Sequence, residues 1–318
     1  TVTGVQTCAL PISFIYCIRP PYLKANDTIY VVAPSNKVDR PHQCQEGIDT
    51  LKSWGLNVVE AFNLFYDNGP TARYAGTVEE RVKSLDIAIH DPNVRAIMCA
   101  RGGYGAPHLV DKVDFAHLVE DPKWLIGYSD ITGLHLAWNT YGVESIHGAM
   151  VQHFNNEVSV SNLKKALFGE YKKLEIDTNK NCVLGEATGK LIGGNLCLLG
   201  HSVGTNWSVE KCAKDGILFI EDTGGATYSE DSLLYTIKNT GLFKNLKGII
   251  VGQFTGVDPR DDMTLDDMIT NHFGNLGIPI MFGVDVGHGE PNYPLYLGRK
   301  IELKVTPEKS TITFLDEE

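Results

Sequence analysis

The sequence predicts an α/β protein in which an N-terminal parallel sheet flanked by helices is followed by a smaller C-terminal α/β domain with a β-rich, swivelling or barrel-like core. Length is the first reason, because 318 residues exceed the size at which one hydrophobic core usually stops growing. The second is that short apolar runs alternate with helical patterns up to residue 150, as parallel strands joined by crossover helices do. The third is a second α/β set that starts near residue 186.

The first domain is expected over residues 20–150. Apolar, β-branched runs there alternate with segments of helical spacing, and crossovers of this kind make strands parallel and cover both faces of the sheet. The expected strands are 28–34, 56–61, 94–100, 124–129 and 143–148, and the expected helices are 44–55, 77–91 and 130–142.

The C-terminal domain is expected over residues 186–318. Residues 151–185 are polar and weakly periodic, which is typical of a connection between domains. In the second domain we expect helices at 229–243 and 265–274, strands at 216–222 and 246–256, and closing strands near 300–305 and 310–315.

Residues 1–12 need separate treatment. The segment VTGVQTCALPI within them resembles the translation of a sequencing-library adapter, so we expect an assembly artefact and leave the segment out of the fold prediction. The authentic start of the protein is then expected to be missing.

Charge and cysteine content exclude several classes of protein. The formal net charge of −11 disfavours nucleic acid and anionic membrane surfaces as partners, because phosphate binding needs clustered Lys and Arg. The seven cysteines form no C-x-x-C pair and no zinc-type spacing, so we expect reduced thiols in a cytoplasmic protein. No apolar run reaches the 18 or so residues that a spanning helix needs.

Ser129 lies where the expected strand 124–129 meets the following helix. The segment LIGYSDI supplies an apolar strand, Gly127 for a crowded turn and a serine at its apex, a pattern typical of a nucleophile elbow. In esterases a glycine follows the serine by two residues, whereas Ile131 stands there in this chain. Serine is also a common helix N-cap, and the local pattern by itself favours capping over a nucleophilic role.

A nucleophilic serine needs a base, and three histidines are candidates. His288 lies in a loop between two glycines, directly after an expected apolar strand, and glycine lets a backbone approach a site closely. His135 lies on the helix after Ser129 and His147 ends a strand of the same domain, so both remain rivals. We expect ordinary surface or core roles for His42, His90, His117, His153, His201 and His272.

The base in turn needs an orienting carboxylate, and the candidates are the neighbours Glu221 and Asp222 at the end of the expected strand 216–222. Alternate side chains of a strand face opposite ways, so only one of the two can orient a given imidazole. The residues by themselves leave open which one does.

A glycine-rich turn follows the expected strand 94–100. Its glycines, Gly102, Gly103 and Gly105, leave backbone amides free to face an anion or a developing oxyanion. The G-x-G-x-x-G spacing of a dinucleotide site is absent, so we expect no such cofactor.

Eight segments, taken in order along the chain, closely resemble the LD-carboxypeptidase family of serine peptidases. They are PPYLKANDTIYVVAPS, CARGGYGA, LIGYSDITGLHLAW, IHGAM, GKLIGGNLCLL, ILFIED, LKGIIVGQFTG and GVDVGHGEPNYPLYLG. The resemblance runs from about residue 20 to the last strands.

This resemblance implies a catalytic triad of Ser129 as nucleophile, Glu221 as carboxylate and His288 as base. It also implies an oxyanion hole made by the backbone amides of Gly103 and Asp130. Members of the family release terminal D-alanine from the murein tetrapeptide in the cytoplasm, without a metal or another cofactor. A murein peptide is therefore the expected substrate, and a homodimer is the expected state.

One further residue is a candidate for substrate binding. An exopeptidase must recognise the free carboxylate of its leaving group, and an acidic protein needs a local cation for this. Arg101 stands beside the glycine turn and is the candidate, against the alternative of a surface arginine that neutralises a strand end.

Two other functions remain alternatives. Microcin C immunity proteins form a related branch that hydrolyses aminoacyl-adenylate analogues, but the arginine of ARGGYGA favours a murein peptide. A non-catalytic binding protein on the same fold is the other alternative, and the presence of all three triad residues argues against it.

Overall fold

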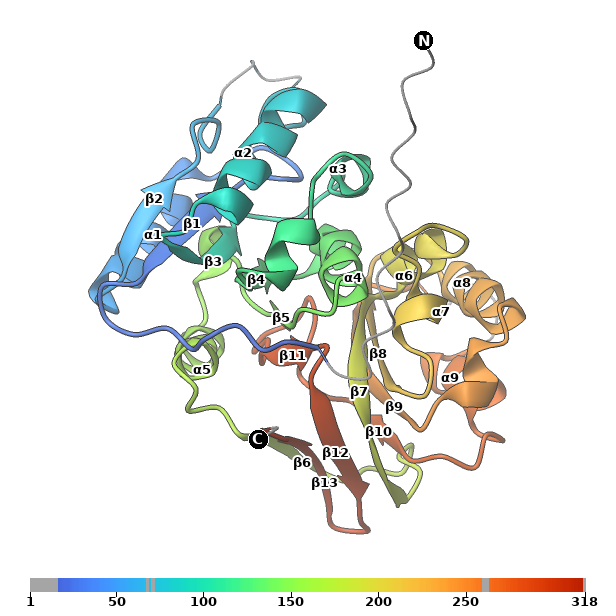
Figure 1. Cartoon of the computed structure of the whole chain (residues 1–318). Coiled ribbons are helices and arrows are strands. Elements are labelled where there is room, and N and C mark those ends of the chain that lie inside the picture. The colour runs from blue at the N-terminus through green and yellow to red at the C-terminus, as the bar shows by residue number, and fades with distance from the viewer. Residues whose placement is uncertain (1–16, 67–68, 70–71, 259–262, 317–318) are drawn as a thin grey trace.

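The structure is a computed structural model that describes residues 17–66, 69, 72–258 and 263–316. Within these ranges the chain forms the two predicted α/β domains, one built on a mostly parallel sheet of six strands and one on a mixed sheet of seven (Figure 1). The adapter-like residues 1–12, with Cys8, lie outside the described residues. The six cysteines among the described residues are all free thiols.

The first sheet has the strand order β11-β5-β4-β3-β1-β2. Its first five strands along the chain are parallel, and β11 is antiparallel to β5. The strands are β1 (Thr28–Val32), β2 (Asn57–Glu60), β3 (Val94–Cys99), β4 (Trp124–Gly127), β5 (Ser145–His147) and β11 (Leu295–Leu297). The α-helices between its first five strands are α1 (Pro41–Ser53), α2 (Val78–His90), α3 (Pro107–Val110) and α4 (Thr132–Thr140).

Local sequence explains where several of these helices begin. Pro41 opens α1, where the missing N–H of proline costs nothing. Thr77 and Glu80 form a reciprocal capping box at the start of α2. The helix predicted from residue 130 begins two residues later, because a short 3₁₀ turn, η2 (Ser129–Ile131), precedes α4.

Residues 151–185, which the sequence indicates as a connection, contain regular structure. Helix α5 (Glu157–Leu167) is capped by the Asn156 side chain, which accepts a hydrogen bond from the Ser159 amide. Strand β6 (Lys173–Asp177) pairs with β13 at the edge of the second sheet. The polar composition of this segment therefore reflects an exposed helix face and a sheet edge.

The second sheet has the order β10-β9-β8-β7-β12-β13-β6. Strands β7 to β10 are parallel, and β12, β13 and β6 are antiparallel. The remaining elements are β7 (Gly185–Asn195), α6 (Leu196–Ser202), α7 (Val209–Cys212), β8 (Ile217–Thr223), α8 (Thr227–Asn239), β9 (Gly248–Thr255), α9 (Leu265–Phe273), β10 (Ile280–Phe282), β12 (Lys300–Val305) and β13 (Lys309–Phe314). None of the helices in the described part of the chain is long and apolar enough to cross a membrane.

The C-terminal part of the chain returns to the first domain. Strand β11, red in Figure 1, lies beside the green β5 and pairs with it, with Leu295 opposite His147. Residues 283–294 thus connect β10 of the second sheet with β11 of the first. The loop that contains His288 is anchored at one end in each domain.

Candidate active site

Ser129 sits at a strained turn directly after β4. Its φ of +65° is in the left-handed region, which a non-glycine residue rarely adopts. Space is short at the preceding glycine, since a Cβ on Gly127 would lie 3.0 Å from the side chain of Ile131. The turn therefore lifts the serine out of the strand, as the predicted elbow does.

The capping role that the local pattern favours for Ser129 is wrong. Neither η2 nor α4 has a side-chain capping hydrogen bond. The Ser129 Oγ instead lies 3.0 Å from Nε2 of His288. The hydroxyl is held by a residue of the distant loop 283–294, which no local pattern can show.

His288 connects the serine to a buried acid. Its Nδ1 lies 2.7 Å from Oε2 of Glu221, on β8 of the second domain. A carboxylate can only accept, so Nδ1 carries a proton, and a ring protonated at Nδ1 alone presents the lone pair of Nε2 to the Ser129 hydroxyl. The geometry thus joins an alcohol, an imidazole and a carboxylate in the order that activates a nucleophile.

Glu221 is fully buried. Burial by itself raises the pKa of this carboxyl, but the imidazoles of His147 and His288 outweigh it and hold the pKa below its usual range. Room for the carboxylate depends on Gly287, whose φ is +138° and where a Cβ would lie 2.9 Å from Glu221 Oε2. The acid is therefore ionised and fixed at neutral pH.

The rival histidines have different surroundings. His135 contacts the Ser145 hydroxyl and the Gly127 carbonyl, and burial lowers its pKa to about 3, so it is a neutral structural residue. His147 is buried beside the acid, with Nε2 3.8 Å from Glu221 Oε1. Among the described residues, neither ring nitrogen of His147 has a hydrogen-bond partner.

Asp222 turns away from the imidazole, as strand alternation requires. Its carboxylate accepts hydrogen bonds from the Asn195 side chain and from the backbone amides of Cys197 and Thr223. Asp222 thereby ties the end of β8 to the start of α6, and Glu221 is the acid that meets His288.

The glycine turn packs directly on the serine. A Cβ at Gly102 would lie 3.1 Å from the Ser129 Cβ, so a larger residue there would crowd the serine. The Asp130 carboxylate fastens the two turns together, because it accepts hydrogen bonds from the Ser35 hydroxyl and the Ala106 amide. The backbone of Gly103, with φ +119°, lies one residue further along this turn.

Arg101 precedes the glycine turn and is largely buried. Its guanidinium forms an ion pair with Asp39 and donates to the Gly102 and Lys37 carbonyls. Asp39 also accepts from the Gln152 side chain, and its own carboxylate is half exposed. The arginine is thus held near the serine turn with an acid already beside it.

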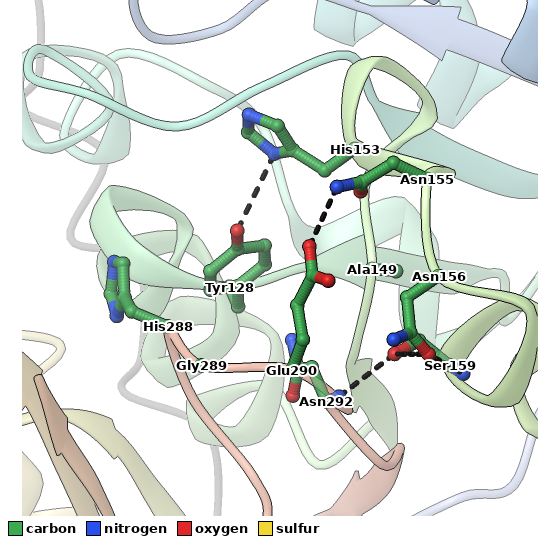
Figure 2. A pocket seen from close by; sticks show the side chains of 10 residues that line it. All are labelled: Tyr128, Ala149, His153, Asn155, Asn156, Ser159, His288, Gly289, Glu290 and Asn292. Carbon is green, nitrogen blue, oxygen red and sulfur yellow. Dashed lines mark hydrogen bonds between the residues drawn. The ribbon is translucent and has the colours of Figure 1, made fainter.

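A cavity of about 170 Å³ opens beside His288 (Figure 2). Tyr128 packs edge-on against the His288 ring, with centroids 5.0 Å apart, and its hydroxyl lies 3.4 Å from Nδ1 of His153. Glu290 accepts a hydrogen bond from Asn155 at 2.6 Å. Sequence reasoning missed this wall, although Tyr128 adjoins the serine and Glu290 follows His288 by two residues.

In the part of the chain that the structure describes, no group of three His, Cys, Asp or Glu side chains is arranged to hold a metal ion. The groups that meet at Ser129 are the imidazole of His288, the carboxylate of Glu221 behind it and the backbone of the glycine turn. Such a set can transfer a proton from the hydroxyl while its oxygen attacks a carbonyl.

Comparisons with known proteins identify the family of this chain. Family models described as the LD-carboxypeptidase N-terminal and C-terminal domains match residues 29–148 and 188–303. A probable murein peptide carboxypeptidase of Bacillus subtilis is 30% identical over 309 residues, 92% of this chain and 93% of that protein.

Solved structures share the fold, and two of them illustrate the match. The muramoyltetrapeptide carboxypeptidase of Oxalobacter formigenes has a TM-score of 0.80 and 26% identity, and the match covers 91% of this chain and 99% of that one. The microcin C7 self-immunity protein MccF, in complex with aspartyl sulfamoyl adenosine, has a TM-score of 0.81 and 22% identity, over 94% and 98% of the two chains. The chain belongs to the LD-carboxypeptidase family.

Proposed function

We propose that this protein is a serine carboxypeptidase that hydrolyses the L,D-peptide bond and releases the terminal D-alanine of the murein tetrapeptide, a step of peptidoglycan recycling. The single observation that supports it most is the contact chain from Ser129 through His288 to Glu221, which crosses both domains. Relatives named as murein peptide carboxypeptidases support the choice of substrate.

In the first half-reaction Ser129 Oγ attacks the carbonyl of the diamino acid that precedes the D-alanine. His288 Nε2 takes the hydroxyl proton, and Glu221 stabilises the imidazolium that forms. The protonated His288 then gives this proton to the departing amine of D-alanine, which leaves an ester on Ser129.

In the second half-reaction water attacks the ester. His288 takes one proton from the water and returns it to Ser129 Oγ as the carbonyl carbon is released. The product is the tripeptide with a free carboxylate. Both halves use the same imidazole, so the enzyme ends the cycle in the state in which it began.

The oxyanion of each tetrahedral intermediate is assigned to the backbone amides of Gly103 and Asp130. Support comes from their positions, because Gly102, the neighbour of Gly103, lies so close to Ser129 that an added Cβ would be 3.3 Å from Oγ, and because Asp130 follows the nucleophile. Amides fixed in this way stabilise the developing charge without reorganisation at the moment of reaction.

Arg101 is the proposed partner of the free D-alanine carboxylate. Asp39 already pairs with it, so a substrate carboxylate has to share or displace this contact. Its test is Arg101→Ala, with Asp39→Asn as a companion variant. Arg101→Ala should raise KM for the tetrapeptide, whereas an unchanged KM would leave Arg101 as a neutraliser of Asp39.

We further propose a homodimer that acts in the cytoplasm. The family resemblance and the free thiols support this. Sedimentation velocity at micromolar concentration is expected to show twice the mass of one chain, and a single-chain mass would refute the dimer.

The experiment that tests the function is incubation with L-Ala-γ-D-Glu-diaminopimelate-D-Ala and mass analysis of the products. Loss of one D-alanine is the expected outcome. Parallel incubation with an aminoacyl sulfamoyl adenosine tests the immunity-type alternative, and preferential cleavage of that compound would refute the murein proposal. Covalent labelling of Ser129 by a fluorophosphonate would argue against a non-catalytic binding protein.

A further inference from the structure

Of the side chains that line the cavity beside His288, only the histidine itself takes part in the proposed catalytic steps. Tyr128, His153, Asn155, Ser159, Glu290 and Asn292 line it together with four other residues. The walls come from the end of β4, from the segment after β5, from α5 and from the loop 283–294. Figure 2 shows the Glu290 side chain directed towards Asn155 and the Tyr128 hydroxyl towards His153.

We infer that this cavity receives the side chain of the residue whose carbonyl Ser129 attacks, and that Glu290 binds the ammonium group of that side chain. The inference rests on the proposed function and adds its specificity determinant. Glu290 belongs neither to the triad nor to the glycine turn, and it is distinct from Arg101. The inference therefore gives a role in substrate selection to a further residue.

Charge is the first argument. Among the ten lining residues Glu290 is the only acid, and none of them is Lys or Arg. Burial, reinforced by the neighbouring Arg101 and Arg40, lowers the pKa of His153, so this ring adds no positive charge at neutral pH. Glu290 therefore supplies the negative charge of the lining, and a carboxylate there favours a cation beside it.

Geometry is the second argument. Tyr128 immediately precedes Ser129, and its ring packs on the catalytic imidazole, so the cavity adjoins the bond that is cut. Its volume of about 170 Å³ is below the range of pockets that hold drug-sized molecules, and it suits one side chain. The amino terminus of the tetrapeptide lies two residues further from the reacting carbonyl.

Preorganisation is the third argument. Asn155 donates to Glu290 Oε1 at 2.6 Å, and this contact between two exposed side chains orients the carboxylate at the cavity wall before substrate arrives. Within the described residues, no hydrogen bond to the other oxygen of Glu290 is found, so it can accept from an ammonium. A charge-assisted hydrogen bond of this kind discriminates more strongly than a neutral one.

The test compares two tetrapeptides that differ only in the third residue, lysine in one and norleucine in the other. Norleucine keeps the aliphatic chain and lacks the ammonium. Because Glu290 is exposed and solvent screens its charge, the wild type is expected to prefer the lysine peptide about 2- to 5-fold in kcat/KM. In Glu290→Gln this ratio should fall close to one, and Glu290→Asp should retain part of the preference.

The matched control is Glu302→Gln, which removes the same charge from an exposed position on β12, outside the cavity. Its lysine-to-norleucine ratio should equal that of the wild type. The inference is overturned if the wild type shows no preference, or if Glu290→Gln slows both peptides in equal proportion.

A binding measurement separates this inference from the proposed function. Calorimetry with Ser129→Ala should show tighter binding of the lysine peptide, and the difference should vanish in the double variant that also has Glu290→Gln. Discrimination in binding without hydrolysis by the wild type would refute the proposed function and leave the cavity assignment standing. Equal binding of the two peptides would refute the cavity assignment itself.

Discussion

Replacement of Arg299 tests how the two domains are held together. Arg299 stands between β11 and β12 and is 2% exposed. Its Nε and Nη2 donate to Oε2 of Glu144 at 2.9 and 2.6 Å, and Nη1 donates to the Tyr22 hydroxyl at 2.9 Å. The guanidinium also lies 3.6 Å from the centroid of the Tyr296 ring. These contacts fix the end of the chain segment that includes the His288 loop.

Arg299→Met removes the cation and leaves Glu144, which is 5% exposed, as an unpaired buried charge. Breaking a buried pair from one side costs about 3–5 kcal/mol. We expect the melting temperature to fall by about 10 °C. We also expect kcat/KM to fall, because β11 anchors the loop that presents His288 to Ser129.

The assay is thermal unfolding followed by circular dichroism, with peptide hydrolysis measured well below the transition. The double variant Arg299→Met with Glu144→Leu should regain most of the lost stability, since an apolar pair removes the unpaired charge. Lys304→Met, which breaks the exposed pair with Glu186, is the control and should leave the melting temperature unchanged. A melting temperature of Arg299→Met close to that of the wild type would refute the reasoning.

Three further predictions follow from the site and its surroundings. Burial, together with the neighbouring Asp222, raises the pKa of Glu230 to about 9. Between about pH 4 and pH 9 the folded wild type therefore keeps a proton on Glu230 that the unfolded chain has lost, and this lowers its free energy of unfolding as pH rises. Glu230→Gln has no such group, so it should match the wild type in stability near pH 4 and become increasingly more stable than the wild type up to about pH 9. A pH-independent difference in urea unfolding would contradict this. Gly287→Ala should lower kcat at least about tenfold with little change in KM, because its Cβ would meet the Glu221 carboxylate, and wild-type kinetics would argue against that crowding. His147→Leu should lower kcat and leave KM nearly unchanged, since it removes the imidazole beside Glu221 Oε1, whereas unaltered kcat would show that His147 only fills space.

Local patterns predicted most of the regular structure. Strands β1 to β5 and β8 were expected within a few residues of their observed bounds, because apolar runs between helical segments are a strong signal. Strand β11 could not be predicted, since it is three residues long and its pairing with β5 depends on a chain segment about 150 positions away.

The site shows the same division between local and distant information. The residues around Ser129 favour capping, and only the contact with His288, 159 positions away, changes that interpretation. Strand alternation limited the acid to one of two neighbours, and the fold then brought Glu221 to the imidazole and Asp222 to the start of α6. The environment of His147 was invisible in sequence because its neighbour Glu221 belongs to the other domain.

The central claim is that Ser129 becomes nucleophilic through His288 and Glu221. Its most direct test is the rate of D-alanine release from the murein tetrapeptide by Ser129→Ala, in protein shown by circular dichroism to be folded. The account predicts a kcat lower by about 10⁴- to 10⁶-fold. Release at the wild-type rate would contradict it.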